Sequence, residues 1–224
     1  MAVASALPSS ASTILIDFGD TISGTTSGLG NTWNSVVDSN PVSNMADTSG
    51  GATTIDIFIS AGGFGENGGA GGGGLASPSQ ALLGDLAVAS ATNDYFFTSG
   101  TQSLTLTLGG LDPTKTYNLD FFGTREQTAT RQTLYTVVDN VGSSNQVLTT
   151  SGTAIGDGGY DGNNDTVASF TNLVPNGSNQ ISFSFTTNNS TFGYLGAMRI
   201  TAVPEPSAVI VGAVGILVLL RRRR

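Results

Sequence analysis

The sequence predicts an all-β protein, an antiparallel β-sandwich of jelly-roll type, and three observations lead to this prediction. Short segments in which apolar and polar residues alternate recur along the chain, as expected of strands with one face in a core. Turns rich in Gly, Asn, Asp and Pro separate these segments. Only 11% of the residues are charged, whereas soluble domains usually carry about 25%. Hydroxyl and amide groups must therefore solvate the surface, which suits an extracellular β-protein.

The alternation is clearest in two segments. In residues 53–60 the side chains of Ile55, Ile57 and Ile59 share one face, and in residues 102–108 the leucines at 104, 106 and 108 do the same. The other expected strands are the apolar run after Thr13 and residues 94–97, 117–122, 132–138, 146–150, 167–173, 180–185 and 193–200.

Two pairings are expected among these strands. Residues 109–116 have the composition of a turn around Pro113, so 117–122 is expected to pair with 102–108. Residues 193–200 are expected to close the sandwich beside the first strand. A short helical segment is expected within residues 79–87.

Residues 61–74 contain nine glycines, and we expect no stable strand or helix there. A long surface loop is the simplest interpretation. The alternative is a binding loop that orders on a ligand. A phosphate-binding loop is excluded because no Lys-Ser or Lys-Thr follows the glycines.

The chain of 224 residues has room for one domain with appendages. We expect a β-sandwich domain over residues 13–202 and a separate C-terminal segment over residues 203–224. Residues 1–12 are small and weakly apolar, and the segment Ser9 to Ser12 suits a leader-peptidase site. They are expected to be either the remnant of a signal peptide or a disordered N-terminus.

The charges are unevenly distributed. Four of the eight basic residues are Arg221, Arg222, Arg223 and Arg224, so before Val203 four basic residues face fifteen acidic ones, a net charge near −11. Such a body offers no basic patch for nucleic acid, and a cation such as Ca²⁺ is a more natural small partner.

The chain contains neither cysteine nor histidine. Disulfides and thiolate chemistry are therefore excluded within it, as are a Ser-His-Asp triad and zinc bound by histidine.

The C-terminal segment contains an apolar run, residues 208–220, that ends in the four arginines 221–224. It predicts a short transmembrane helix, since thirteen residues at a rise of ~1.5 Å cover about 20 Å of a hydrocarbon layer of roughly 30 Å. The arginine cluster favours a cytoplasmic C-terminus, which places the preceding domain outside the inner membrane.

Pro204, Glu205 and Pro206, followed by the short apolar helix and the basic cluster, resemble the PEP-CTERM sorting signal of bacterial surface proteins. The resemblance implies export, a transient inner-membrane intermediate, and recognition and cleavage by an exosortase. The product would lie at the cell surface or in the extracellular polysaccharide matrix. The alternative is an ordinary single-pass tail anchor.

A second resemblance involves the domain itself. The Leu-rich strand, the following Gly-Leu-Asp-Pro-Thr-Lys-Thr-Tyr-Asn-Leu and the Phe-Phe-Gly-Thr-Arg that ends at Arg125 resemble β-sandwich modules of the galactose-binding-like and fibronectin-like type. This resemblance implies a sandwich and does not specify a ligand.

Candidate glycan contacts are Trp33, Tyr95 and Arg125. The indole face of Trp33, the single tryptophan, could cover the apolar face of a pyranose, and the alternative is a core residue. Arg125 and Arg131 flank a polar segment beside Glu126, which suits sugar hydroxyls or a carboxylate. The alternative is that an arginine fixes a loop by pairing with an acid.

Residues 156–165 combine glycines with oxygen-bearing side chains. Asp157, Asp161, Asn163 and Asp165 are candidate calcium ligands, because Ca²⁺ takes six to eight oxygens from a loop that can curl. The spacing fits neither an EF-hand loop nor a nonapeptide repeat, and a plain Asn/Asp/Gly turn is the alternative.

These observations predict a non-catalytic structural or interaction protein that is exported by its sorting signal, with no cofactor other than Ca²⁺. The alternative is a carbohydrate-binding module, assisted by calcium or not. A third hypothesis is a glycosidase that uses two carboxylates, with Glu66 or Glu126 as candidates.

Overall fold

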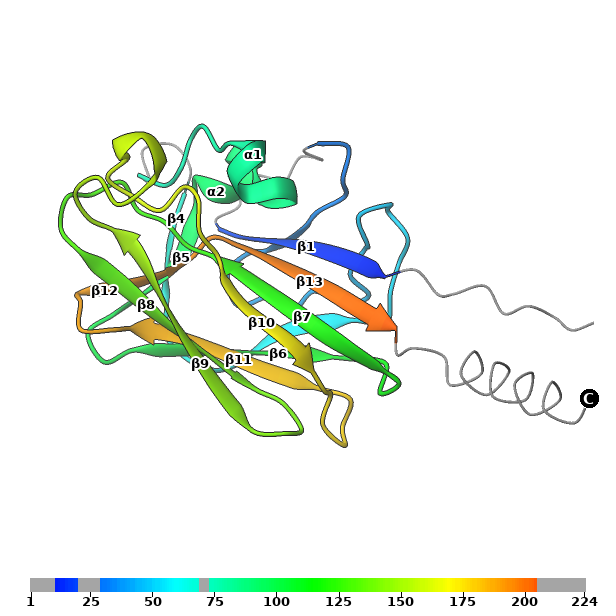
Figure 1. Ribbon diagram of the computed structural model, residues 1–224. Coiled ribbons are helices and arrows are strands. Elements are labelled where there is room, and N and C mark those ends of the chain that lie inside the picture. The colour runs from blue at the N-terminus through cyan, green and yellow to red at the C-terminus, as the bar shows by residue number, and fades with distance from the viewer. Residues whose placement is uncertain (1–10, 20–28, 69–72, 205–224) are drawn as a thin grey trace, which may run out of the picture.

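The computed structural model describes residues 11–19, 29–68 and 73–204, and its elements are almost all strands (Figure 1). They form two five-stranded sheets and one three-stranded sheet. The strands are β1 Ser12–Phe18, β2 Asn34–Val36, β3 Asp56–Gly62, β4 Gly65–Asn67, β5 Tyr95–Ser99, β6 Ser103–Gly109, β7 Lys115–Phe122, β8 Arg131–Val138, β9 Ser143–Ser151, β10 Ala168–Leu173, β11 Ile181–Thr187, β12 Phe192–Leu195 and β13 Ala197–Pro204.

The first large sheet has the order β10-β7-β13-β1-β2 and the second β3-β6-β11-β8-β9. Every pairing is antiparallel except that of β1 with β2, where Ile16 lies beside Asn34 and Phe18 beside Val36 in parallel register. The β-sandwich prediction is confirmed, with β2 as a parallel addition at one edge. Its finer assignment as a jelly roll stays a prediction.

The main core lies between the two large sheets. From the second sheet the leucines of β6 and the Ile181, Phe183 and Phe185 side chains of β11 point inward, and from the first sheet Leu119, Phe121, Met198 and Ile200 do. The period-two patterns of residues 102–108 and 180–185 place the leucines of β6, and likewise Ile181, Phe183 and Phe185 of β11, on one face of their strand, and that face is the one in the core. Each such side chain stabilises the fold by about 1.5–3 kcal/mol relative to an exposed one.

The expected pairing of residues 102–108 with 117–122 is wrong. β6 pairs with β3 and β11, whereas β7 pairs with β10 and β13 in the other sheet. The connection crosses between the sheets because Leu111 is buried in the core between them. Gly110, at φ +67°, packs against the carbonyl of Thr54, where a Cβ would overlap it.

The expectation of no regular structure in residues 61–74 is also wrong in part. β3 continues to Gly62, and β4 pairs with β5 over Gly65 to Asn67. A Cβ on Gly65 would overlap the ring of Phe97, so glycine lets this strand lie against an aromatic side chain. Packing therefore supplies the order that local propensity lacks.

Helix is confined to short pieces in the described part of the chain. α1 Gln80–Leu83 and the 3₁₀ turn η2 Gly84–Leu86 confirm the predicted helical segment, and α2 Ala89–Thr92 follows them. None of the helices described is long and apolar enough to cross a membrane.

β13 lies beside β1, as expected, with Ser12 opposite Ala202. Its last residue, Pro204, lies opposite Lys115 of β7, so the first residues of the predicted sorting segment belong to the sheet. Glu205, Pro206, the predicted helix 208–220, the arginines 221–224 and residues 1–10 lie outside the described residues.

The start of β1 and the end of β13 lie at one end of the sandwich, and the three-stranded sheet β12-β5-β4 lies at the other (Figure 1). β13 connects the two ends, because β12 ends two residues before it begins. At about 3.3 Å per residue its eight residues span about 26 Å.

Candidate functional site

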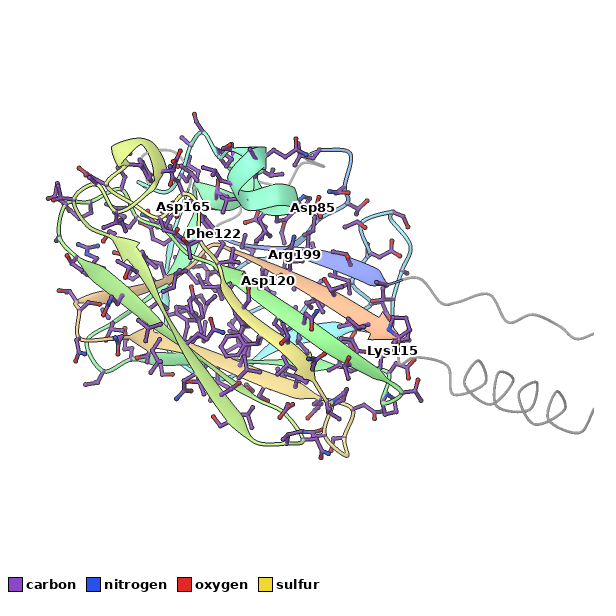
Figure 2. All side chains as sticks on the ribbon, viewed as in Figure 1. Asp85, Lys115, Asp120, Phe122, Asp165 and Arg199 are labelled. Carbon is purple, nitrogen blue, oxygen red and sulfur yellow. The ribbon has the colours of Figure 1, made fainter. Side chains whose placement is uncertain are left out.

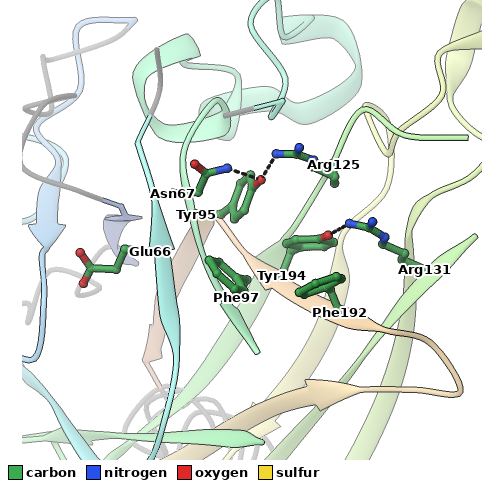
Figure 3. Close-up of a pocket in the computed structure, with 8 residues that line it drawn as sticks. All are labelled: Glu66, Asn67, Tyr95, Phe97, Arg125, Arg131, Phe192 and Tyr194. Atoms are coloured by element: carbon green, nitrogen blue, oxygen red, sulfur yellow. Dashed lines mark hydrogen bonds between the residues drawn. The ribbon is translucent and has the colours of Figure 1, made fainter. Parts of the chain in front are cut away.

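A surface hollow of about 360 Å³ lies at the three-stranded sheet (Figure 3). This volume is within the range of small-ligand sites, roughly 300–1,000 Å³, which combine apolar walls with a few polar groups. Four aromatic side chains, two arginines, an amide and a carboxylate line it: Glu66, Asn67, Tyr95, Phe97, Arg125, Arg131, Phe192 and Tyr194.

β5 supplies two of the rings through its alternation. Phe96 and Thr98 point inward and are fully buried, which turns Tyr95 and Phe97 to the opposite face, toward the hollow. The sequence Tyr-Phe-Phe-Thr thus serves the core and the site at once. The ring of Phe96 packs edge-on against Phe18 of the main core, at a centroid distance of 5.6 Å.

β12 supplies the other two rings. Tyr194 lies directly opposite Phe97 in the sheet register, and Phe192 lies opposite Ser99. The hydroxyl of Tyr135, which is fully buried in the core, donates a hydrogen bond of 2.5 Å to the main-chain carbonyl of Tyr194. The second large sheet therefore fixes the backbone of β12.

The four rings have different exposures. Tyr95 and Tyr194 are each only 2% exposed and meet edge to face, with centroids 4.9 Å apart. Phe97 and Phe192 are partly exposed and meet edge to face at 5.9 Å. The tyrosines thus form the inner wall, and the two phenylalanines present apolar surface to solvent.

Arg125 is held by the backbone on both sides. Its main-chain N–H donates to the carbonyl of Thr150 at 2.9 Å, and the N–H of Glu126 donates to the carbonyl of Gly73 at 2.6 Å. Its Nη1 donates to the hydroxyl of Tyr95. The same hydroxyl accepts a hydrogen bond of 2.6 Å from Nδ2 of Asn67 on β4 (Figure 3).

Arg131, the first residue of β8, is arranged in the same way. Its Nη1 donates to the hydroxyl of Tyr194. Its guanidinium carbon lies 4.7 Å from the ring centroid of Phe192 and 5.8 Å from that of Tyr194, within cation–π distance. Each arginine is therefore oriented by a phenol, and both cations line the hollow (Figure 3).

The phenols remain neutral in this setting. Burial raises the pKa of Tyr95 above its ordinary value, although Asn67, Arg125 and Arg131 each favour the anionic form. Burial likewise raises the pKa of Tyr194 against the effect of both arginines. No phenolate therefore compensates the guanidinium charges near neutral pH, and Arg125 and Arg131 are the cations whose charge acts on both phenols.

Glu66 borders the hollow from the other face of its strand. It lies opposite Phe96 in the register, so alternation places its side chain away from the rings. Figure 3 shows its carboxylate directed away from the aromatic cluster. The side chains that point into the hollow are thus aromatic, amide and cationic.

The structure brings together two of the three candidate glycan contacts and separates the third. Tyr95 and Arg125 meet in the hollow, but Trp33 is only 8% exposed and packs with Leu15, Leu83 and Leu86 in a second hydrophobic cluster. Trp33 therefore follows the alternative interpretation, a core residue. An indole adds buried apolar area there, whereas a sugar platform would need an exposed face.

The four candidate calcium ligands have structural partners in the described residues. Asn163 is buried, and its Nδ2 donates to the carbonyls of Gly123 and Thr166 at 3.1 and 2.8 Å. Asp161 accepts from the N–H of Ala154 at 2.8 Å, and Asp165 from the hydroxyl of Thr166 at 2.8 Å.

The fourth candidate, Asp157, takes part through its backbone, with its N–H bound to Asn164. Within the described ranges no three acidic side chains gather as a metal would require. These contacts favour the Asn/Asp/Gly turn, and calcium binding stays a prediction.

The sequence alone does not indicate Asn67, Phe97, Phe192 or Tyr194 as site residues, whereas it offers Arg131, together with Arg125, for a site that suits sugar hydroxyls or a carboxylate. The scarcity of cations before Val203 was the one signal that led to the arginines. The four missed residues come from strands far apart in the chain, and only the register of β4, β5 and β12 places them together.

No family model and no curated protein matches the chain. Among solved structures, the extracellular domain of ANXUR2 from Arabidopsis thaliana aligns with a TM-score of 0.53 and 14% identity, covering 86% of this chain and 49% of that one. The chain thus spans about half the length of that protein. This likeness shows a shared fold.

Two further structures align more weakly. TmCBM61 in complex with β-1,4-galactotriose has a TM-score of 0.27 and 13% identity, over 49% of this chain and 66% of that one. The exo-β-1,3-galactanase of Phanerochaete chrysosporium has a TM-score of 0.29 and 12% identity, over 65% of this chain and 32% of that one. At these scores neither bears on function.

Proposed function

We propose that this chain is a non-catalytic carbohydrate-binding β-sandwich whose binding site is the hollow at the three-stranded sheet. The observation that carries the proposal is the meeting, in one hollow, of two partly exposed phenylalanine rings with two oriented arginines and an amide. A pyranose has an apolar face of C–H groups and a rim of hydroxyls, and it needs both kinds of partner.

In this proposal each kind of side chain has its own role. The rings of Phe97 and Phe192 contact the apolar face of the sugar, and the remaining N–H groups of Arg125 and Arg131 donate to its hydroxyl oxygens. An arginine has five N–H donors in a fixed fork, so one bond to a tyrosine leaves several for a ligand. Because the phenols already orient both forks, little side-chain entropy is lost on binding.

The non-catalytic assignment rests on the side chains that point inward. Glycoside hydrolysis by the usual route needs two carboxyl groups across the scissile bond. Among the described residues that line the hollow, Glu66 alone carries one, and it is directed away from the rings (Figure 3).

The test is binding of the full chain to a panel of neutral and acidic oligosaccharides, by array and then by calorimetry. Phe192→Ala is expected to weaken binding by at least about tenfold through loss of an anchoring ring. Phe58→Ala is the matched control, because Phe58 is a half-buried ring on β3, outside the hollow. Absence of binding to every saccharide, or unchanged binding by folded Phe192→Ala, would overturn the proposal.

We further propose that the PEP-CTERM-like segment acts as an export and sorting signal cleaved by an exosortase, which places the sandwich in the extracellular matrix. Pro204 ends β13 at the end of the sandwich opposite the hollow, so attachment or cleavage there leaves the site open. Mass spectrometry of protein from cells and medium is expected to give a C-terminus between Val203 and Pro206. An intact Arg224 in the membrane fraction would instead show a simple anchor.

A further inference from the structure

The basic residues of the sandwich divide into two kinds. Lys115 lies 3.6 Å from Asp112, and Arg199 lies 2.8 Å from Asp120, so these two cations are paired with carboxylates. Figure 2 shows Asp120 and Arg199 close together on the first sheet and Lys115 at the end of the sandwich where β13 finishes. Neither cation belongs to the lining of the hollow.

Arg125 and Arg131 are different. In the described part of the chain neither forms an ion pair, although fifteen acidic residues precede Val203. Their hydrogen-bond partners are the hydroxyls of Tyr95 and Tyr194, which stay neutral. The two cations that form no ion pair with a described residue thus line the same hollow.

Placing two arginines without a carboxylate partner at one hollow costs free energy, and binding of a neutral ligand would not offset that cost. Two like charges beside buried rings repel each other and lose hydration, and a carboxylate partner would relieve both effects. The carboxylate among the described lining residues, that of Glu66, is directed away from the aromatic cluster (Figure 3). An anionic ligand can therefore supply the negative charge that pairs with Arg125 and Arg131.

Resting on the proposed carbohydrate site, we propose that the hollow selects anionic saccharides, in which a uronate carboxylate or a sulfate lies between Arg125 and Arg131 while the ring stacks on Phe97 and Phe192. Carboxylates and sulfates match the guanidinium fork through paired, charge-assisted hydrogen bonds. The net negative charge of the body opposes long-range attraction of a polyanion. At physiological ionic strength that repulsion is screened beyond about 8 Å, so the contacts within the hollow determine the affinity for an anionic saccharide.

The experiment compares polygalacturonate with its fully methyl-esterified form, which has the same backbone and no charge, together with a sulfated galactan. The full chain is expected to bind the acid at least about tenfold more tightly than the ester, because charge-assisted hydrogen bonds are lost on esterification. Binding to the sulfated galactan alone would also support the anionic class and would identify sulfate as the preferred group.

Variants separate a local effect from one of net charge. Arg131→Gln and Arg125→Gln are each expected to lower affinity for the acid by about tenfold or more and to reduce the preference for acid over ester. Lys115→Gln makes the same change in net charge at the other end of the sandwich and is expected to leave affinity unchanged. Arg131→Lys keeps the charge without the fork and is expected to give an intermediate affinity.

The outcomes are distinguishable. Equal affinity for acid and ester, or equal loss in Arg131→Gln and Lys115→Gln, would overturn the anionic selectivity and leave the carbohydrate site standing. Binding to neutral glycans only would do the same. Thermal unfolding of each variant shows whether it is folded. If Arg131→Gln does not fold, Arg125→Gln and the comparison of acid with ester on the unmodified chain still test the anionic selectivity.

Discussion

The guanidinium carbon of Arg131 lies 4.7 Å from the ring centroid of Phe192, although β8 belongs to the second large sheet and β12 to the three-stranded sheet. The contact joins the two parts of the fold at the candidate site. It also leaves Phe192 with a cation on one side and partial exposure to solvent. A sandwich whose core is built elsewhere thus presents an aromatic and cationic surface at one end.

Trp33 provides the first prediction. Trp33→Ala removes a buried indole from the second hydrophobic cluster and is expected to lower the free energy of unfolding by about 3–5 kcal/mol. Trp33→Phe is expected to lose less and to bind glycans with unchanged affinity. Chemical denaturation and calorimetry measure the two effects. A folded Trp33→Phe that no longer binds would return Trp33 to the binding site.

The second prediction concerns Gly65. Gly65→Ala places a methyl group against the Phe97 ring, and the overpacking is expected to cost about 1–3 kcal/mol and to weaken glycan binding by displacing that ring. Gly177→Ala is the control, because an added Cβ there meets no atom within 4 Å. If both variants keep the stability and affinity of the original chain, β4 does not support Phe97 as described.

The third prediction concerns stability at alkaline pH. Burial, followed by the nearby Glu126, raises the pKa of Tyr160 to about 12 from its ordinary value of 10.0. Below pH 10 the folded and unfolded chains both keep this proton. From pH 10 toward 12 the unfolded chain loses it first, so the free energy of unfolding must fall.

Denaturation from pH 8 to 12 is therefore expected to show stability constant up to about pH 10 and falling above it, with Tyr95 and Tyr194 acting in the same direction. Tyr160→Phe is expected to reduce the alkaline slope. A stability that rises above pH 10 would contradict the burial of these phenols.

The fourth prediction concerns catalysis. Glu66→Gln is expected to leave glycan affinity unchanged, and the original chain is expected to release no reducing sugar from any polysaccharide that it binds. Glu126→Gln is expected to behave in the same way. Hydrolysis by the original chain that disappears in either variant would show that the glycosidase hypothesis is right.

The predictable part of the fold is the part set by local pattern. The alternation of Leu104, Leu106 and Leu108 predicts both the strand and its inward face, because one side of each strand must enter a core. The crossing after β6 depends on the burial of Leu111, and β4 depends on a ring from another strand lying over Gly65. Neither contact is visible in a local window of sequence.

The site divides in the same way. The sequence indicates Arg125 because the domain has few cations. It indicates Tyr95 because this residue begins an aromatic strand. Phe192 and Tyr194 lie about a hundred residues from Tyr95 and join it only through the pairing of β12 with β5. The residue type of Trp33 suits a sugar platform, but its burial in the second hydrophobic cluster depends on packing that residue type does not reveal.

The measurement that tests the carbohydrate site most directly is a titration of the full, isotope-labelled chain with a bound oligosaccharide, followed by NMR. The largest shift changes are expected at the amides and side chains of Asn67, Phe97, Arg125, Arg131 and Phe192, with none at Phe58 or Lys115. Shift changes centred on residues 156–165 or on any other face, with those of the hollow unmoved, would contradict it.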